Sequence, residues 1–139
     1  MTHPTRTTLT VAVMDAPYES ARSTTALRII DLAVRRGWNV NVFAYEGAIG
    51  IASAKQAQHP NAVHGRDLAA EDHPNPKEWV AALMAEAGKR GSKIDWVQCG
   101  LCVDERGIAE WVPGPRRGSP ADLVKFVEES DNTLVIPTK

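Results

Sequence analysis

The sequence predicts an α/β protein with three layers, in which a mostly parallel sheet is flanked by helices on both faces. Short apolar runs rich in β-branched residues alternate with longer segments whose apolar residues recur at helical spacing. The order is strand, helix, strand, helix, strand, helix, strand, and parallel strands need such crossover helices. The chain has the length of one ordinary domain, so we expect residues 1–139 to form a single domain with residues 1–7 flexible.

The first strand–helix–strand unit comes early in the chain. Residues 8–14 form an apolar run that ends at Asp15-Ala16-Pro17, as expected for a buried strand that enters a loop. Residues 20–36 are predicted to be helical, and Gly37 follows the basic last turn in the position that favours a left-handed cap. The apolar stretch 38–44 follows at once as the second strand, so we expect a right-handed crossover.

The middle of the chain continues the alternation. Residues 47–54 are small and predict a loop with a short helix, whereas residues 58–74 are polar and aperiodic, which indicates a surface segment. Asn75 is the expected cap of a helix that has a proline in its first position and ends near Gly91. Residues 93–98 form the predicted third strand.

The C-terminal part supplies the last helix and strand. The stretch that leads to Gly118 is interpreted as a Pro/Gly/Arg loop. Ser119, followed by a proline and an aspartate, predicts the capped start of a helix that ends near Ser130. Residues 133–137 complete the pattern as a strand that its proline ends.

Composition and charge exclude several classes of partner. The formal net charge of −1 offers no electrostatic reason to bind nucleic acid or an anionic membrane. No apolar run approaches the roughly 18 residues that span a bilayer, and the polar start does not resemble a secretory signal. We therefore expect a cytoplasmic protein that binds neither nucleic acid nor membranes. Arg116 and Arg117 either attract an anionic partner or form a solvated face.

The candidate catalytic residues are Cys99 and Cys102, the only two cysteines, which follow the third predicted strand as Cys-x-x-Cys. The carboxyl ends of parallel strands are where α/β proteins place their chemistry. A thiolate is the reactive form of cysteine, and a helix beginning at residue 100, together with Arg106, would favour it. Asp104 and Glu105 would oppose it, so the sequence leaves the net effect open.

Three other interpretations of the two cysteines remain open. They could simply be packed, since cysteine is among the residues most often buried. They could form a redox pair of the thioredoxin kind, although we identify no loop that would carry the usual cis-proline. A zinc site is the weakest interpretation, because four ligands are needed and the histidines of the 58–74 stretch are scattered. We therefore expect neither a metal nor a cofactor.

Further candidate site residues follow the other predicted strands. Asp15, Pro17 and Tyr18 come after the first strand, and Gly47 comes after the second, so all four should lie at the same edge of the sheet as the cysteines. We expect them, with Arg106, to line a substrate pocket. The alternative for Asp15 is that its carboxylate caps the next helix.

The segment 99–108 resembles the Cys-Gly-x-Cys-x-x-x-Arg-Gly motif of DsrE/DsrF-like proteins, a group that includes the TusD and DsrE sulfur carriers. The loop Asp15-Ala16-Pro17-Tyr18 is similar to the Asp-Pro-Tyr loop of that family. Residues 35–52, RRGWNVNVFAYEGAIGIA, are similar to its pattern of glycine, strand, Val-Phe and Gly-Ile. The resemblance covers most of the chain apart from residues 58–74.

The resemblance implies a DsrE-like sheet, assembly into trimers or hexamers, and a sulfur relay between donor and acceptor proteins through a cysteine persulfide. In TusD-like members the sulfur-carrying cysteine lies eight residues before the glycine of Arg-Gly, and that spacing from Gly107 leads to Cys99. Cys102 matches a related branch of the family. The expected function is that of a small sulfur carrier or sulfurtransferase. The alternatives are a dithiol oxidoreductase and a non-catalytic DsrE-like binding subunit.

Overall fold

The computed structural model describes residues 6–57 and 75–138, which build a five-stranded sheet in the order β4-β3-β2-β1-β5. All four strand pairings are parallel. The predicted segment 58–74, with its histidines, lies outside the described residues. The strands are β1 (Thr8–Val13), β2 (Asn39–Ala44), β3 (Ile94–Cys99), β4 (Arg116–Gly118) and β5 (Asn132–Ile136).

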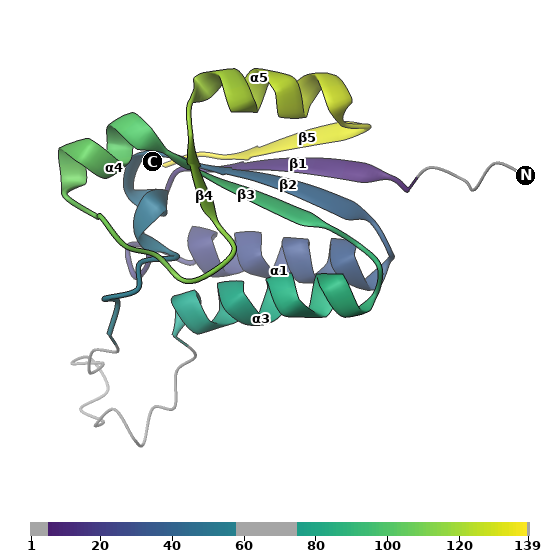
Figure 1. Cartoon of the computed structure of the whole chain (residues 1–139), viewed down its shortest axis with the longest axis horizontal. Helices are drawn as coiled ribbons and strands as arrows, with labels where there is room; N and C mark the ends of the chain where they lie inside the picture. The colour runs from purple at the N-terminus through teal and green to yellow at the C-terminus, as the bar shows by residue number, and fades with distance from the viewer. Residues whose placement is uncertain (1–5, 58–74, 139) are drawn as a thin grey trace, which may run out of the picture.

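Helices cover both faces of this sheet, which confirms the predicted three-layer α/β fold. Figure 1 shows α1 and α3 on one face and α5 on the other, with α4 at the carboxyl end of the strands. No described helix is both long and apolar enough to cross a membrane. The helices are α1 (Arg22–Arg35), the 3₁₀ helix η1 (Glu46–Gly50), α3 (Pro76–Lys89), α4 (Gly100–Arg106) and α5 (Pro120–Glu129).

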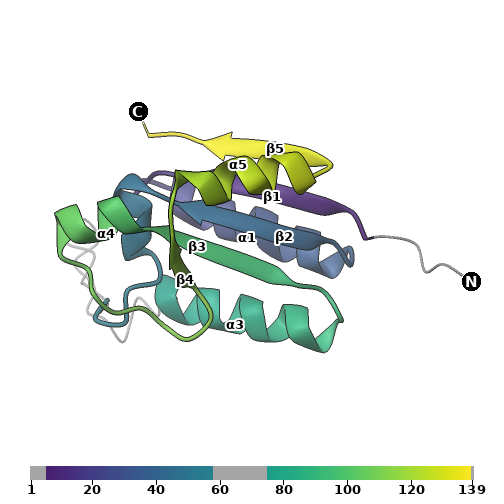
Figure 2. The ribbon, with the colours of Figure 1, turned by 45° about the horizontal axis from the view of Figure 1, so that its top comes forward.

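The direction of the chain across the sheet explains this division of helices. From β1 to β4 each strand is added on the same side of its predecessor, and the crossovers α1 and α3 lie on one face (Figure 2). α5 then carries the chain back over the opposite face to β5, which pairs with the other edge of β1. The strand order therefore reverses between β1 and β5, and α/β proteins bind ligands beside such a reversal, outside the carboxyl ends of the strands.

The two faces of the sheet differ in polarity. Residues in register share a face, and the row Val11, Val42 and Trp96 is fully apolar on the face that two helices cover. The row Thr10, Asn41 and Asp95 lies on the face that α5 covers alone. There the buried Thr10 hydroxyl donates a 3.2 Å hydrogen bond to the Phe126 carbonyl oxygen of α5. A polar row is tolerated on this face because it is partly solvated and hydrogen-bonded.

Local signals were accurate at most boundaries. Gly37 has the predicted left-handed backbone, with φ of 80°, and Ser119 forms a capping box with Asp122. Asn75 precedes α3 as predicted, although its side chain makes no capping hydrogen bond. The interpretation of the stretch to Gly118 as a loop was wrong, because its last three residues form β4. Three residues are too few to show periodicity, and two of them are arginines.

Candidate functional site

Cys99 and Cys102 occupy the junction between β3 and α4. Cys99 is the last residue of β3 and the N-cap of the seven-residue α4, so the helix predicted after the motif is present. Both residues are free cysteines and both are buried, with 5% of Cys99 and 8% of Cys102 exposed. Two thiols are thus brought together at the carboxyl edge of the sheet, with little direct exposure to solvent.

The environment distinguishes the two sulfurs. Burial is the largest influence on Cys102 and raises its pKa, and a hydrogen bond with Cys99 raises it further. The backbone N–H of Glu46 donates a 3.1 Å hydrogen bond to the Cys102 sulfur, which opposes this rise without cancelling it. Because a raised pKa favours the neutral form, Cys102 stays a thiol near neutral pH and can donate its proton to the Cys99 sulfur.

The Glu46 amide reaches Cys102 because η1 is held against β3. Glu46 adopts a left-handed backbone with φ of 52°, and its carboxylate forms a 3.1 Å ion pair with Arg106 at the end of α4. The fully buried Gln98 donates a 2.7 Å hydrogen bond to the Ile49 carbonyl oxygen and accepts one of 2.9 Å from the Trp96 indole. Sequence reasoning missed Gln98, whose only signal is a polar residue at the end of an apolar strand.

Three of the predicted pocket residues, Asp15, Gly47 and Arg106, line an open cleft of about 630 Å³. Pro17 and Tyr18 do not line it. Pro17 packs near Gly50, where a Cβ atom would lie 3.4 Å from its Cδ, and the exposed Tyr18 has a left-handed backbone. The cleft is lined by Met14, Asp15, Ala16, Glu19, Ser20, Arg22, Glu46, Gly47, Arg106 and Thr138.

The cleft lies where the strand order reverses, between the segments that follow β1 and β5. The most buried charged residue of the cleft is Asp15. Its carboxylate accepts a 2.5 Å hydrogen bond from the Ser20 hydroxyl and forms a 3.5 Å ion pair with Arg22. Asp15 therefore does not cap α1 directly, since Ser20 stands between its carboxylate and the first helical amide. The cysteines do not line the cleft, but its Glu46 wall touches Cys102. The role of these residues in binding substrate stays a prediction.

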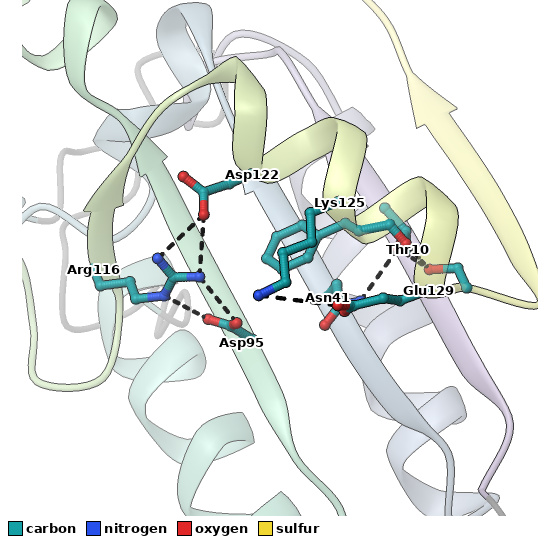
Figure 3. A network of polar contacts seen from close by, with 9 residues as sticks. Thr10, Asn41, Asp95, Arg116, Asp122, Lys125 and Glu129 are labelled. Carbon is teal, nitrogen blue, oxygen red and sulfur yellow. Dashed lines mark hydrogen bonds and ion pairs between the residues drawn. The ribbon is translucent and has the colours of Figure 1, made fainter.

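Arg116 and Arg117 point to opposite sides of β4, as consecutive strand residues do. Figure 3 shows Arg116 between Asp95 of β3 and Asp122 of α5, and we name these three residues the α5 cluster. Arg117 instead makes two hydrogen bonds, of 3.0 and 2.9 Å, to the Asp104 carboxylate of α4. Its guanidinium also lies against Gly100, where a Cβ atom would be only 2.8 Å from its Cζ.

We name Arg117, Asp104 and Cys99 the α4 cluster, because the guanidinium meets the residue that directly follows Cys99. The pKa of Asp104 is lowered by its hydrogen bonds with Arg117, so this carboxylate is ionised near neutral pH. Within residues 6–57 and 75–138, no group of three or more His, Cys, Asp or Glu side chains could hold a metal ion. The groups that the described structure brings together at this edge are two thiols and charged side chains.

Comparison with known proteins identifies a family and a fold. The model of the DsrE/DsrF-like family matches residues 8–136. The uncharacterized protein MJ0989 of Methanocaldococcus jannaschii is 33% identical over 90% of this chain and 96% of its own length. The uncharacterized protein MK0008 of Methanopyrus kandleri is 31% identical over 91% of each chain. The crystal structure of the ychN protein from E. coli has a TM-score of 0.71 at 18% identity, covering 94% of this chain and 99% of that one.

Proposed function

The chain belongs to the DsrE/DsrF-like family, and from this membership we propose that it carries sulfane sulfur as a persulfide on Cys99. Family membership suggests a role of the sulfur-relay type, in company with partner proteins. The observation that carries the assignment to Cys99 is the difference between the two sulfurs. Burial and its hydrogen bond with Cys99 raise the pKa of Cys102 and favour its neutral thiol, and we therefore assign the sulfur to Cys99.

The proposed loading step is a thiol–disulfide type of exchange. The Cys99 thiolate attacks the outer sulfur of a donor persulfide, a new S–S bond forms, and the old S–S bond breaks with its electron pair left on the donor thiolate. Cys99 then bears the terminal sulfur as a persulfide anion. An acceptor thiolate attacks that terminal sulfur in the same way, and Cys99 leaves as a thiolate. No oxidant is consumed in either step.

Cys102 gives the persulfide a second possible fate. Its thiolate can attack the inner sulfur of the Cys99 persulfide, which forms a Cys99–Cys102 disulfide and releases hydrosulfide. The raised pKa of Cys102 makes this thiolate scarce near neutral pH, so the reaction would be slow there and faster in alkaline solution. Retention of the sulfur on Cys99 is therefore the favoured outcome at neutral pH.

Two observations favour the alternative functions. The burial of both cysteines is what a non-catalytic subunit with packed thiols would have. The electrostatic influence of Cys99 on the pKa of Cys102 is also compatible with a dithiol oxidoreductase. Alkylation of the native protein separates the three functions, because packed thiols resist iodoacetamide and a carrier cysteine reacts near neutral pH. A redox pair instead forms a reversible disulfide with a defined potential.

Assembly into a homo-oligomer in the cytoplasm, as a trimer or hexamer, is part of the same proposal. Its support is that the last helix and the edge strand β5, which is paired on one side only, expose large apolar side chains. These exposed residues are Val124 and Val127 of α5 and Leu134 and Val135 of β5. Exposed apolar patches mark protein interaction sites. Sedimentation of the wild type should give a multiple of the chain mass, and the double variant Val124→Lys/Val135→Lys should sediment as a smaller species.

The proposed function is tested by incubating the protein with a persulfide donor and measuring its intact mass. The wild type and Cys102→Ser should gain the mass of one sulfur atom, and an added acceptor thiol should remove it. Cys99→Ser should gain nothing. Loading that persists in Cys99→Ser and vanishes in Cys102→Ser would reverse the assignment, and the absence of loading in all three proteins would refute it.

A further inference from the structure

We propose that Arg117 is the charge partner of the anionic sulfur on Cys99, a positioning residue that moves between this sulfur and the Asp104 carboxylate. The inference deepens the proposed function and rests on it, because the anions concerned are the thiolate and the persulfide of a sulfur carrier. Arg117 belongs to a pair of arginines that the sequence could assign only to a general anionic partner or to a solvated face.

The first support is where the guanidinium lies. A Cβ atom on Gly100 would come within 2.8 Å of Cζ, Nε and Nη2 of Arg117, so the guanidinium occupies the space that a side chain would fill. Gly100 directly follows Cys99, so the guanidinium lies against the residue next to the sulfur-bearing one. The absence of a side chain at position 100 thus lets a cation rest beside the sulfur-bearing residue.

The second support is the present partner of Arg117. Its two hydrogen bonds to Asp104 are well formed, but both side chains are exposed, Arg117 by 51% and Asp104 by 63%. Solvent screens such a pair, so it is easily opened. The pKa of Arg117 is raised mainly by its hydrogen bonds to Asp104, and the charge of Cys99 raises it further.

The other charged groups near the cysteines do not serve this purpose. Arg106, the arginine that sequence reasoning placed near the motif, is paired with Glu46 of η1. Cys102 of α4 is neutral because its pKa is raised by burial. Arg117 of β4 is the arginine that lies against the residue following Cys99, and its exposed pair with Asp104 of α4 can open.

A developing negative charge on Cys99 would draw Arg117 away from Asp104. The thiolate and then the persulfide anion would each gain a cation, while the exposed Asp104 carboxylate would be solvated by water. The charge on the guanidinium does not change, and no bond is made or broken. Arg117 would thereby increase the fraction of Cys99 that is ionised near neutral pH, which is the fraction that reacts.

The test uses the Cys102→Ser background, in which Cys99 is the only cysteine, and measures the rate of iodoacetamide alkylation across pH. Arg117→Gln should move the midpoint of the profile to higher pH and slow alkylation at neutral pH by roughly two- to fivefold. Arg117→Lys should restore part of the rate, and Asp104→Asn should increase it because the competing anion is gone. The difference should narrow in high salt.

Arg116→Gln is the matched control, because it removes the neighbouring arginine, which belongs to the α5 cluster. Its profile should coincide with that of the parent protein. The proposal is overturned if Arg117→Gln and Arg116→Gln have the same profile. The absorbance of the Cys99 thiolate, measured across pH, gives the same midpoint and needs no reagent that must reach a buried sulfur. The comparison of variants can therefore be made even if alkylation is slow.

Sulfur loading separates this proposal from the proposed function. If the parent protein gains sulfur on Cys99 and Arg117→Gln keeps the parent's pH profile, the charge partner is wrong and the carrier function stands. If Arg117→Gln shifts the profile and no sulfur is gained by any variant, the electrostatic contact is correct and the carrier function fails.

Discussion

Two adjacent arginines, Arg116 of the α5 cluster and Arg117 of the α4 cluster, make different contacts. Arg116 bridges two carboxylates, one on β3 and one on α5, and so ties the last helix to the sheet. Arg117 pairs with one exposed carboxylate and lies against the residue that follows Cys99. The two residues are of the same type and are neighbours in sequence, but consecutive strand residues point to opposite sides of the strand. The role of each arginine therefore depends on the groups that lie on its own side.

The largest expected effect concerns β3, the strand that carries Asp95 of the α5 cluster and Cys99 of the α4 cluster. Gln98→Ala should lower the free energy of unfolding by about 2–4 kcal/mol, because it opens a cavity and leaves the Trp96 indole N–H and the Ile49 carbonyl unpaired. Chemical denaturation measures the change. Gln98→Leu restores the volume without the hydrogen bonds and should lose nearly as much. A Leu variant as stable as the wild type would mean that the hydrogen bonds contribute little.

The second effect compares Cys102 with the α4 cluster. In Cys99→Ser, where Cys102 is the only cysteine, alkylation should become appreciable only in alkaline solution, at a higher pH than for a free cysteine. The reason is that burial raises the pKa of Cys102, so the thiolate is scarce at lower pH. The rate of iodoacetamide reaction across pH measures it. A profile at or below that of free cysteine would contradict the division of roles between the two sulfurs.

A smaller effect tests the structural side of the comparison. Arg116→Gln should lower the free energy of unfolding by about 1 kcal/mol or less, because the arginine is half exposed and solvent screens its two ion pairs. Thermal unfolding detects the change, and Arg117→Gln, whose ion pair is more exposed, should change stability less. The comparison breaks if Arg117→Gln is the more destabilising of the two.

The smallest effect tests the space beside Cys99. Gly100→Ala should push the Arg117 guanidinium aside, because the new Cβ would meet it at 2.8 Å and the flexible end of the side chain can move. Cys99 alkylation in the Cys102→Ser background should then slow by roughly twofold. Stability should hold, since alanine favours a helix more than glycine does. An unchanged rate would show that the position of the guanidinium does not matter.

The sequence predicted the fold well where the signals are local and repeated. The strands 8–13, 39–44 and 94–99 are apolar runs between turn residues, and Gly37 and Ser119 mark helix ends by backbone and capping chemistry. β4 was not predictable, because three residues show no periodicity and its pairing with β3 depends on tertiary contacts. The polar row under α5 was not predictable either, because its polarity depends on how many helices cover each face of the folded sheet.

The site was predictable only in part. The carboxyl-edge rule brought Asp15, Gly47 and the cysteines to one end of the sheet, as expected from parallel strands. The burial of both sulfurs, the Glu46 amide and the partner of Arg117 could not be predicted, because each depends on segments far apart in the chain that meet only after folding. Arg106 was expected to favour a thiolate in the motif by its positive charge, whereas the structure pairs it with Glu46.

The most direct test of the central claim is to locate the added sulfur within the wild-type protein. Trypsin releases residues 94–106 as one peptide that contains both cysteines, and fragment ions from between the cysteines separate them. After incubation with a persulfide donor and alkylation, the extra sulfur atom should be found on Cys99, with Cys102 alkylated directly or left as a thiol. Extra sulfur on Cys102, or none on either residue, would contradict the account.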